Sequence, residues 1–175
     1  MDKLIIFTDG SYRKKYNYCG YGVHFPNKEW RSYGNTFKFE PLTNQRAELY
    51  AIYSALKRAK KIITRNKNYK EINIYSDSMY SIDCLTKWWI NWEKNDWINK
   101  DKKPVLNQDM IKPNLTIIKE IKDMNIKILF FHVNSHTGKK DFNSLNNEIA
   151  DKLANLKFTR HIKKDFDNQN KKQFI

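Results

Sequence analysis

The sequence has few cysteines and no long apolar run, and both absences narrow the class of protein. Its 175 residues include two cysteines, Cys19 and Cys84, which are too few for a disulfide framework and lack the spacing of metal ligands. No apolar stretch approaches the roughly 20 residues that a transmembrane helix needs, and no signal-peptide pattern opens the chain. We therefore expect a soluble intracellular protein, cytoplasmic, nuclear or virus-encoded, with free thiols and no membrane association.

Acidic residues are outnumbered by basic ones. The chain has 19 Asp and Glu against 33 Lys and Arg, which gives a formal net charge of +14. Apolar residues make up 40% of the chain and aromatic residues 14%, so this charge belongs to a folding sequence. Such a surface favours nucleic acid as a partner, and a merely solvated basic surface is the alternative. We expect one folded domain over residues 1–156, a basic tail over residues 157–175, and a monomer without an obligate protein partner.

Two predicted strands each end at an aspartate. Residues 3–8 form an apolar, β-branched run that stops at Asp9, and residues 71–75 form a second run that leads to Asp77. Open α/β folds bind ligands at the carboxyl ends of their parallel strands. If the two strands are parallel neighbours, both carboxylates lie at the same rim of the sheet.

Three further runs complete the predicted sheet. Residues 20–25 and 30–39 read as strands antiparallel to the first, and residues 126–133 read as the last strand. His136 follows this strand in a Gly-containing loop. A lone histidine is more often structural than catalytic, but its place beside the rim makes His136 a candidate.

Two predicted helices each contribute one more acid. Thr43 supplies capping chemistry for the first helix, and Glu48 is expected in its first turn. Glu48 is either a rim carboxylate or only a partner of the helix dipole, with Arg46 as its surface neighbour. Residues 147–156 form the last predicted helix, on which Asp151 can point back toward the sheet.

The four acids together favour a divalent metal site. Carboxylates brought close together repel one another unless cations lie between them, and oxygen ligands select Mg²⁺ or Mn²⁺. Two such ions about 4 Å apart can support in-line attack at phosphorus. A basic protein with this cluster is expected to cut a phosphodiester. The acids are Asp9, Glu48, Asp77 and Asp151.

Two other stretches are dominated by basic residues. Residues 87–103 contain four tryptophans among lysines, a composition typical either of core packing or of stacking on bases and sugars beside phosphate contacts. We expect a split, with some rings packed inward and at least one exposed. Residues 57–70 carry seven basic residues and no acid, and read as a helix end followed by a solvated loop.

Five motifs in order resemble type 1 ribonuclease H. They are residues 7–11 (FTDGS), 43–49 (TNQRAEL), 75–78 (YSDS), 133–136 (VNSH) and 147–151 (NEIAD). Several motifs in register are far more specific than one. The resemblance implies an α/β fold with a five-stranded mixed sheet flanked by helices. It also implies an endonuclease that hydrolyses the RNA strand of RNA–DNA hybrids and leaves 5′-phosphate and 3′-hydroxyl ends.

The same resemblance implies roles for individual residues. Asp9, Glu48, Asp77 and Asp151 would hold two Mg²⁺ or Mn²⁺ ions, with Asp9 bridging both, and His136 would assist proton transfer or product release. Asn44 and Gln45 would contact RNA 2′-hydroxyls, which distinguish RNA from DNA. The remaining substrate contacts implied are Gly10 and Ser11, the DNA-phosphate pocket of Thr43 and Asn107, the aromatic channel of Tyr80 and Trp88, and a basic protrusion over residues 89–103.

The chain departs from the family pattern at three places. Lys15 stands where many members have an asparagine that contacts RNA, Pro41 stands where some have a phosphate-binding arginine, and the loop between His136 and Asp151 is longer than usual. Two other functional classes remain open at this point. One is a catalytically silent nucleic-acid-binding module, and the other is a nuclease domain related to reverse transcriptases or strand-transfer enzymes.

Overall fold

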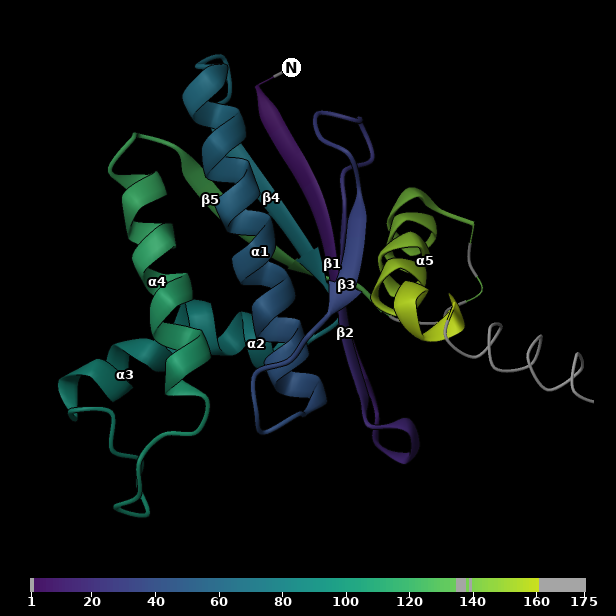
Figure 1. Cartoon of the computed structure of the whole chain (residues 1–175). Coiled ribbons are helices and arrows are strands. Elements are labelled where there is room, and N and C mark those ends of the chain that lie inside the picture. Colours follow the sequence, from purple (N-terminus) through teal and green to yellow (C-terminus); the bar gives the residue numbers. More distant parts are fainter. Residues whose placement is uncertain (1, 135–137, 139, 161–175) are drawn as a thin grey trace, which may run out of the picture.

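The computed structural model describes residues 2–134, 138 and 140–160, and its centre is one mixed sheet (Figure 1). The sheet has five strands in the order β3-β2-β1-β4-β5, which confirms the predicted fold class. Helices α1 and α4 lie side by side on one face, and α5 covers the other face over β1 and β2. The strands are β1 Lys3–Arg13, β2 Tyr18–His24, β3 Tyr33–Thr36, β4 Glu71–Ser76 and β5 Lys127–His132.

The helices occupy both sides of the sheet and one end of it. They are η1 Lys14–Tyr16, α1 Asn44–Arg65, α2 Met79–Asp83, the π-helical turn η2 Cys84–Trp88, α3 Trp89–Lys94, α4 Gln108–Lys122 and α5 Phe142–Ala154. None of these helices, within the part of the chain that the structure describes, is long and apolar enough to cross a membrane. Most of the predicted basic tail, residues 161–175, lies outside the described residues.

Strand β1 is apolar on both faces because helices cover both. Leu4 and Ile6 are buried in the large core that α1, α4 and β4 share. Phe7 faces the other way, into a small cluster with Ala150 of α5. A strand buried on two sides reads as a continuous apolar run, which is the pattern found at residues 3–8.

The parallel pairing of β1 with β4 brings the two strand-end aspartates to one rim. Thr8 pairs with Ser76 at the last position of the β1–β4 ladder. Asp77 follows β4 at this point, and Asp9 is the next residue of β1, where it pairs with Gly22 of β2. Strand β5 is parallel to β4 and ends level with it, at His132. The predicted convergence of the two aspartates is therefore confirmed, although β1 does not stop at Asp9 as predicted but continues to Arg13.

Helix α5 begins earlier than predicted and buries a different face. It starts at Phe142, capped by Asp141, whose carboxylate accepts a hydrogen bond from the Ser144 N–H at 3.0 Å. The helix thus begins five residues before its predicted start at residue 147. Ile149 is 39% exposed although apolar spacing favours an inward position for it, and the buried side chains of the helix are small or polar. They are Asn146, Asn147, Ala150 and Ala154.

Glycines in the sheet let helix backbones approach closely. A Cβ atom on Gly22 would lie 2.7 Å from the backbone nitrogen of Ala154 in α5, and one on Gly10 would lie 2.7 Å from the carbonyl carbon of Ala47 in α1. Gly20 and Gly34 meet the α5 backbone in the same way. No larger residue fits without moving a helix. The glycines therefore fix how near α1 and α5 lie to the strands that end at the rim.

The tryptophan-rich stretch is divided between core and surface, as predicted, and it is helical as far as Lys94. Helix α2 continues without a break through η2 into α3. Trp92 and Trp97 pack partly buried against the main core, whereas Trp88 is 40% exposed. Edge-to-face contact between Trp88 and Trp92, with ring centroids 5.8 Å apart, joins the two groups.

Arg46 is a buried clamp between two helices and not the surface neighbour of Glu48 that the sequence suggested. Its guanidinium donates two hydrogen bonds of 2.7 Å to the carboxylate of Asp109, in the first turn of α4. It also donates to the carbonyl of Glu40 at 3.2 Å. Bidentate pairs of this kind fix direction as well as distance. Arg46 therefore ties the start of α1 to the start of α4.

We expect Gly22→Ala to destabilise the fold by about 3 kcal/mol, because the added methyl group collides with helix backbone that cannot rotate away. Urea unfolding followed by circular dichroism measures this. Gly138→Ala is the control, since a Cβ there meets open space and only its left-handed backbone (φ +66°) opposes the change. That control is expected to lose about 1 kcal/mol. Equal losses in the two variants would contradict the close-approach argument.

Asp109→Asn is expected to cost about 1 kcal/mol at pH 7, because the carboxylate is open to water and its pair with Arg46 is partly screened. Hydrogen bonding from Arg46 lowers the pKa of Asp109. A lowered pKa stabilises the fold above the unfolded-state pKa near 4 and loses this effect as the pH falls further. The stability difference between Asp109→Asn and the unsubstituted protein should therefore shrink between pH 5 and pH 3. A difference that grows in this range would refute the assignment.

Candidate active site

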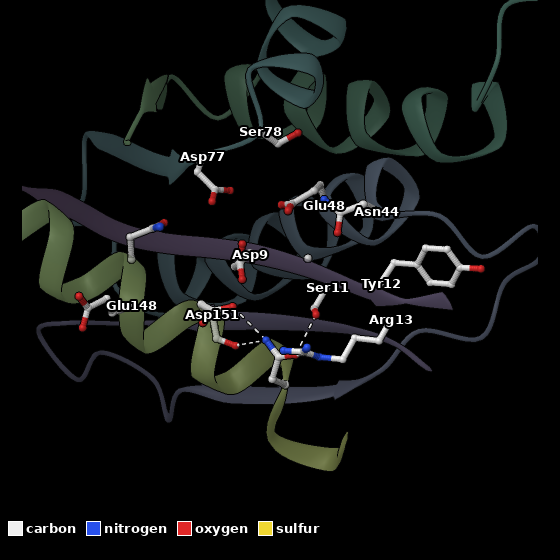
Figure 2. Close-up of a pocket in the computed structure, with 13 residues that line it drawn as sticks. Asp9, Ser11, Tyr12, Arg13, Asn44, Glu48, Asp77, Ser78, Glu148 and Asp151 are labelled. Carbon is white, nitrogen blue, oxygen red and sulfur yellow. Dashed lines mark hydrogen bonds between the residues drawn. The ribbon is translucent and has the colours of Figure 1, made fainter. Parts of the chain in front are cut away.

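Three carboxylates converge where β1, α1 and β4 meet (Figure 2). One oxygen from each of Asp9, Glu48 and Asp77 lies within 4.8 Å of the others. Asp9 continues β1, Asp77 follows β4, and Glu48 projects from α1 at the point where its backbone rests on Gly10. The structure thus brings together the three acids that the sequence predicted to meet.

Glu48 is a rim carboxylate and not a partner of the helix dipole. Because Thr43 caps α1, the helix begins at Asn44, and Glu48 is its fifth residue instead of lying in the first turn as predicted. Its side chain faces inward, with 3% of the residue exposed. Of the two interpretations left open by the sequence, the geometry supports the one in which Glu48 faces Asp9.

Burial and mutual repulsion make these acids reluctant to ionise. Desolvation raises the pKa of Asp9 well above its usual value, and the nearby carboxylates of Asp77 and Asp151 raise it further. Desolvation likewise raises the pKa of Glu48, with Asp9 and Asp77 adding to it. The pKa of Asp77 is raised chiefly by burial. The cluster is therefore electrostatically strained at neutral pH unless positive charge enters it.

The donor set fits a hard divalent cation. Among the described residues, Glu48 Oε2 and Asn147 Oδ1 are buried without a hydrogen-bond partner. Buried oxygens in this condition are unusual, and a cation can satisfy them. The available ligands are carboxylate and amide oxygens, which Mg²⁺ and Mn²⁺ prefer. This chemistry fits divalent metal binding by Asp9, Glu48 and Asp77.

Asp151 faces the same cavity from α5 and is held by a neighbour one turn later. Asn155 Nδ2 donates to Asp151 Oδ1 at 2.9 Å and to the Asp151 carbonyl at 3.0 Å. Asn155 Oδ1 in turn accepts hydrogen bonds from Ser11 Oγ at 2.8 Å and from Arg13 Nε at 2.9 Å. Asn155, which is 8% exposed, thus joins β1 to α5 beside the acids.

The cavity around the acids is polar and measures about 510 Å³. Predicted residues that line it, besides the four acids, are Gly10, Ser11 and Asn44. Lining residues that the sequence analysis missed are Tyr12, Arg13, Ser78, Asn147, Glu148 and Asn155. The two-residue period of β1 puts Arg13 on the same face as Asp9, and helical spacing puts Asn155 beside Asp151. Both positions could therefore have been predicted from the sequence.

Other predicted substrate contacts lie outside this cavity. Gln45 is exposed in the first turn of α1, and the Thr43 hydroxyl caps that helix by accepting from the Arg46 N–H at 3.2 Å. Asn107 Nδ2 donates to the Tyr80 hydroxyl at 2.9 Å. The Tyr80 ring contacts the Trp88 ring edge-to-face, with centroids 6.0 Å apart. These residues form a surface that continues from the start of α1 toward α3.

Of the histidines at positions 132 and 136, the structure describes His132. His136 lies outside the described residues. His132, at the end of β5, was not singled out from the sequence, and its Nε2 lies 3.1 Å from the carbonyl oxygen of Asp77. Two of the three departures from the family pattern are exposed side chains: Lys15 lies in η1 and Pro41 lies before α1.

Comparison with known proteins gives a consistent result. The family model RNase H matches residues 1–158. The probable ribonuclease H of Acanthamoeba polyphaga mimivirus is 37% identical over 138 residues, which cover 78% of this chain but 56% of that protein. The ribonuclease H of Orientia tsutsugamushi is 32% identical over 172 residues, covering 97% of this chain and 90% of that protein.

Solved structures agree on the fold. The solution structure of the PFV RNase H domain superposes with a TM-score of 0.65 at 23% identity, covering 87% of this chain and 92% of that domain. A foamy viral protease–reverse transcriptase in complex with RNA/DNA hybrid matches with a TM-score of 0.66 at 20% identity, covering 87% of this chain and 19% of that one. Family model, relatives and fold together establish that this chain belongs to the ribonuclease H family of endonucleases.

Proposed function

We propose that this protein is an endoribonuclease that hydrolyses the RNA strand of RNA–DNA hybrids with the help of divalent metal ions. The observation that carries the proposal is the buried meeting of Asp9, Glu48 and Asp77 in a chain of net charge +14. Three acids facing a polyanion weaken its binding unless they serve another purpose, and holding cations is the purpose that fits their chemistry. The mimiviral and Orientia relatives carry the name ribonuclease H, which supports the activity.

In this proposal the acids hold the metal and the chain around them positions the RNA. Asp9, Glu48 and Asp77 would bind two Mg²⁺ or Mn²⁺ ions together with Asp151, with Asp9 shared between them. When bound, such ions activate a water molecule and stabilise the leaving 3′-oxygen, which leaves 5′-phosphate and 3′-hydroxyl ends. We assign His136 to proton transfer or product release.

Recognition of the hybrid follows from residues at the start of α1 and beyond it. Asn44 lines the cavity and Gln45 lies exposed beside it, so both can reach ribose 2′-hydroxyls, the groups by which RNA differs from DNA. Gly10 and Ser11, in β1, line the same cavity and are proposed to contact the substrate as well. Thr43 and Asn107, joined through Arg46, are proposed to bind a DNA phosphate. Tyr80 and the exposed Trp88 are proposed to pack on DNA sugars.

The missing family asparagine has a possible substitute inside the cavity. Arg13 Nε is engaged by Asn155, and the guanidinium lies over the Phe158 ring at 4.9 Å, which fixes the side chain. Arg13 also lines the cavity around the acids. We assign Arg13, more than the exposed Lys15, to contact an RNA phosphate near the cut.

A catalytically silent binding module is the competing function. It keeps the basic surface but has no use for buried acids that raise one another's pKa. The test is incubation of the purified protein with a labelled RNA–DNA hybrid, duplex DNA and duplex RNA, each with Mg²⁺ or with EDTA. We expect Mg²⁺-dependent cutting of the RNA strand of the hybrid alone. Tight binding of all three without cutting would establish the silent module instead.

Asp9→Asn is expected to reduce cleavage at least about a thousandfold, because the variant loses a metal ligand worth several kcal/mol in the transition state. Hybrid binding in EDTA, measured by fluorescence anisotropy, should stay within about threefold, since the basic surface is intact. Loss of binding in parallel with cleavage would contradict the assignment of Asp9 to chemistry.

The same variant should be more stable than the unsubstituted protein at pH 7 in EDTA. A carboxyl whose pKa is raised by folding favours the fold while protonated, and this contribution is lost as the pH rises above the unfolded-state value near 4. The neutral amide of Asp9→Asn does not ionise, so the variant does not lose this part of the free energy of unfolding as the pH rises. Adding Mn²⁺ should raise the unfolding temperature of the unsubstituted protein more than that of the variant. A variant that is less stable than its parent in EDTA would argue against electrostatic strain in the cluster.

Asn155→Ala is expected to weaken cleavage and Mn²⁺ affinity about 10- to 100-fold, the usual effect of removing a group that orients a metal ligand. The side chain of Asp151 loses its donor, and Ser11 and Arg13 lose their acceptor. Isothermal titration with Mn²⁺ measures the affinity apart from catalysis. Asn143→Ala, on an exposed position of the same helix, is the matched control and should behave as the parent. Unchanged Mn²⁺ affinity in Asn155→Ala would refute the positioning role.

A further inference from the structure

We propose that the solvent-facing side of α1, beyond the acid cluster, binds single-stranded nucleic acid that extends from the hybrid. We call this surface the α1 strip and define it by Tyr53, Lys57, Arg58, Lys61 and Arg65. The choice of nucleic acid rests on the proposed function. The sequence of residues 57–70 predicts a helix end and a solvated loop. In the structure α1 extends to Arg65, and its basic side chains make the contacts described below.

Two adjoining hollows run along the strip. The first, about 150 Å³, lies over α1 between Tyr50 and Lys61. The second, about 450 Å³, lies between α1 and α4, with Ile117 and Glu120 on its far side. Lys57 and Lys61 line both hollows. The two therefore form one continuous basic depression instead of isolated surface charges.

The cations of the strip are largely uncompensated. Lys60 pairs with Glu120 at 3.0 Å, at the edge of the second hollow. Within the described ranges, Lys57 and Lys61 have no carboxylate at ion-pair distance, and both are exposed. Unpaired lysines that share a depression concentrate positive potential, which attracts a phosphate backbone.

Aromatic rings lie among these cations and hold them in place. The Arg58 guanidinium lies 4.5 Å from the centroid of the Trp30 ring, and Arg65 lies 5.7 Å from the same ring. Lys57 lies 5.4 Å from the centroid of the Tyr53 ring. The basic side chains of an ordinary solvated helix face do not rest on aromatic rings, so these contacts distinguish the strip from such a face. Fixed cations beside rings are the arrangement found in single-strand binding grooves.

The aromatic side of the strip leads toward the start of α1, where Asn44 lines the active-site cavity. Tyr53 contacts Tyr50, which contacts Phe39, with ring centroids 5.9 and 5.4 Å apart. Phe39 is 52% exposed and offers a face on which a base can stack. An α-helix rises 1.5 Å per residue, so Lys61 lies about 20 Å along the axis from Glu48. A strand leaving the hybrid near the start of α1 can therefore follow the helix.

Stacking rings favour nucleic acid over an acidic peptide as the occupant. An acidic segment would use the lysines but would gain little from the exposed ring of Phe39. A single strand uses both, because each nucleotide carries a phosphate and a base with a π face. Duplex DNA hides its base faces, so the strip is expected to prefer unpaired strands.

The test compares a blunt RNA–DNA hybrid with the same hybrid carrying a ten-nucleotide single-stranded DNA extension at one end or the other. Binding is measured by fluorescence anisotropy in EDTA, so cleavage plays no part. For the unsubstituted protein, we expect one extension to strengthen binding about tenfold and to steepen its salt dependence. Lys57→Gln/Lys61→Gln should remove this gain, lower the salt slope by roughly 1.4, and leave blunt-hybrid binding within about twofold.

The control Lys119→Gln/Lys122→Gln removes the same charge from α4 and should keep the gain from the extension. All four lysines are exposed, so the variants are expected to fold, and circular dichroism checks this. The proposal is overturned if neither extension strengthens binding, if the control loses the gain as well, or if an acidic peptide displaces the extension from the strip more effectively than oligothymidylate does. If the blunt hybrid is bound but never cut with Mg²⁺, the proposed function fails, while the result for the extension still decides this inference.

Discussion

The contact between helix backbones and glycines of the sheet is the constraint on which the site depends. At Gly10, α1 lies so close to β1 that Glu48 comes beside Asp9, and at Gly22 α5 lies so close to β2 that Asp151 faces the same cavity. Neither approach leaves room for a Cβ atom. Acids far apart in the sequence are therefore brought together by the smallest side chains of the fold, and the sheet register contributes Asp77.

The site and the surface have opposite electrostatic demands, and the fold separates them. Buried acids raise one another's pKa and oppose folding until cations arrive. The basic groups that attract nucleic acid lie on the helices around this cavity and stay solvated or rest on rings, as Arg58 does on Trp30. Arg46 is different, since it is buried, paired with Asp109, and used to hold two helices together. The buried acids of the rim, the buried pair of Arg46 with Asp109 and the exposed basic groups thus occupy different layers of one small domain.

The sequence predicts what depends on local pattern and misses what depends on distant partners. Apolar runs ending in Asp9 and Asp77 identify the central strands, and motif order identifies the family. The inward face of α5 could not be inferred from apolar spacing, because the helix packs through its backbone on glycines and leaves Ile149 outside. The buried state of Arg46 depends on an acid 63 residues away. Asn155 and Arg13 follow the period of their elements, but only the structure joins them.

The two hydrophobic clusters have a consequence for how the site assembles. Asp9, Glu48 and Asp77 come from elements that share the large core, whereas α5 packs on a small cluster of Phe7, Val133 and Ala150. Small clusters open at lower free energy than the core of a domain. Release of α5 would carry Asp151 and Asn155 away while the other three acids stay in register. The opening of α5 would thereby place Asp151 under a thermodynamic control separate from that of Asp9, Glu48 and Asp77.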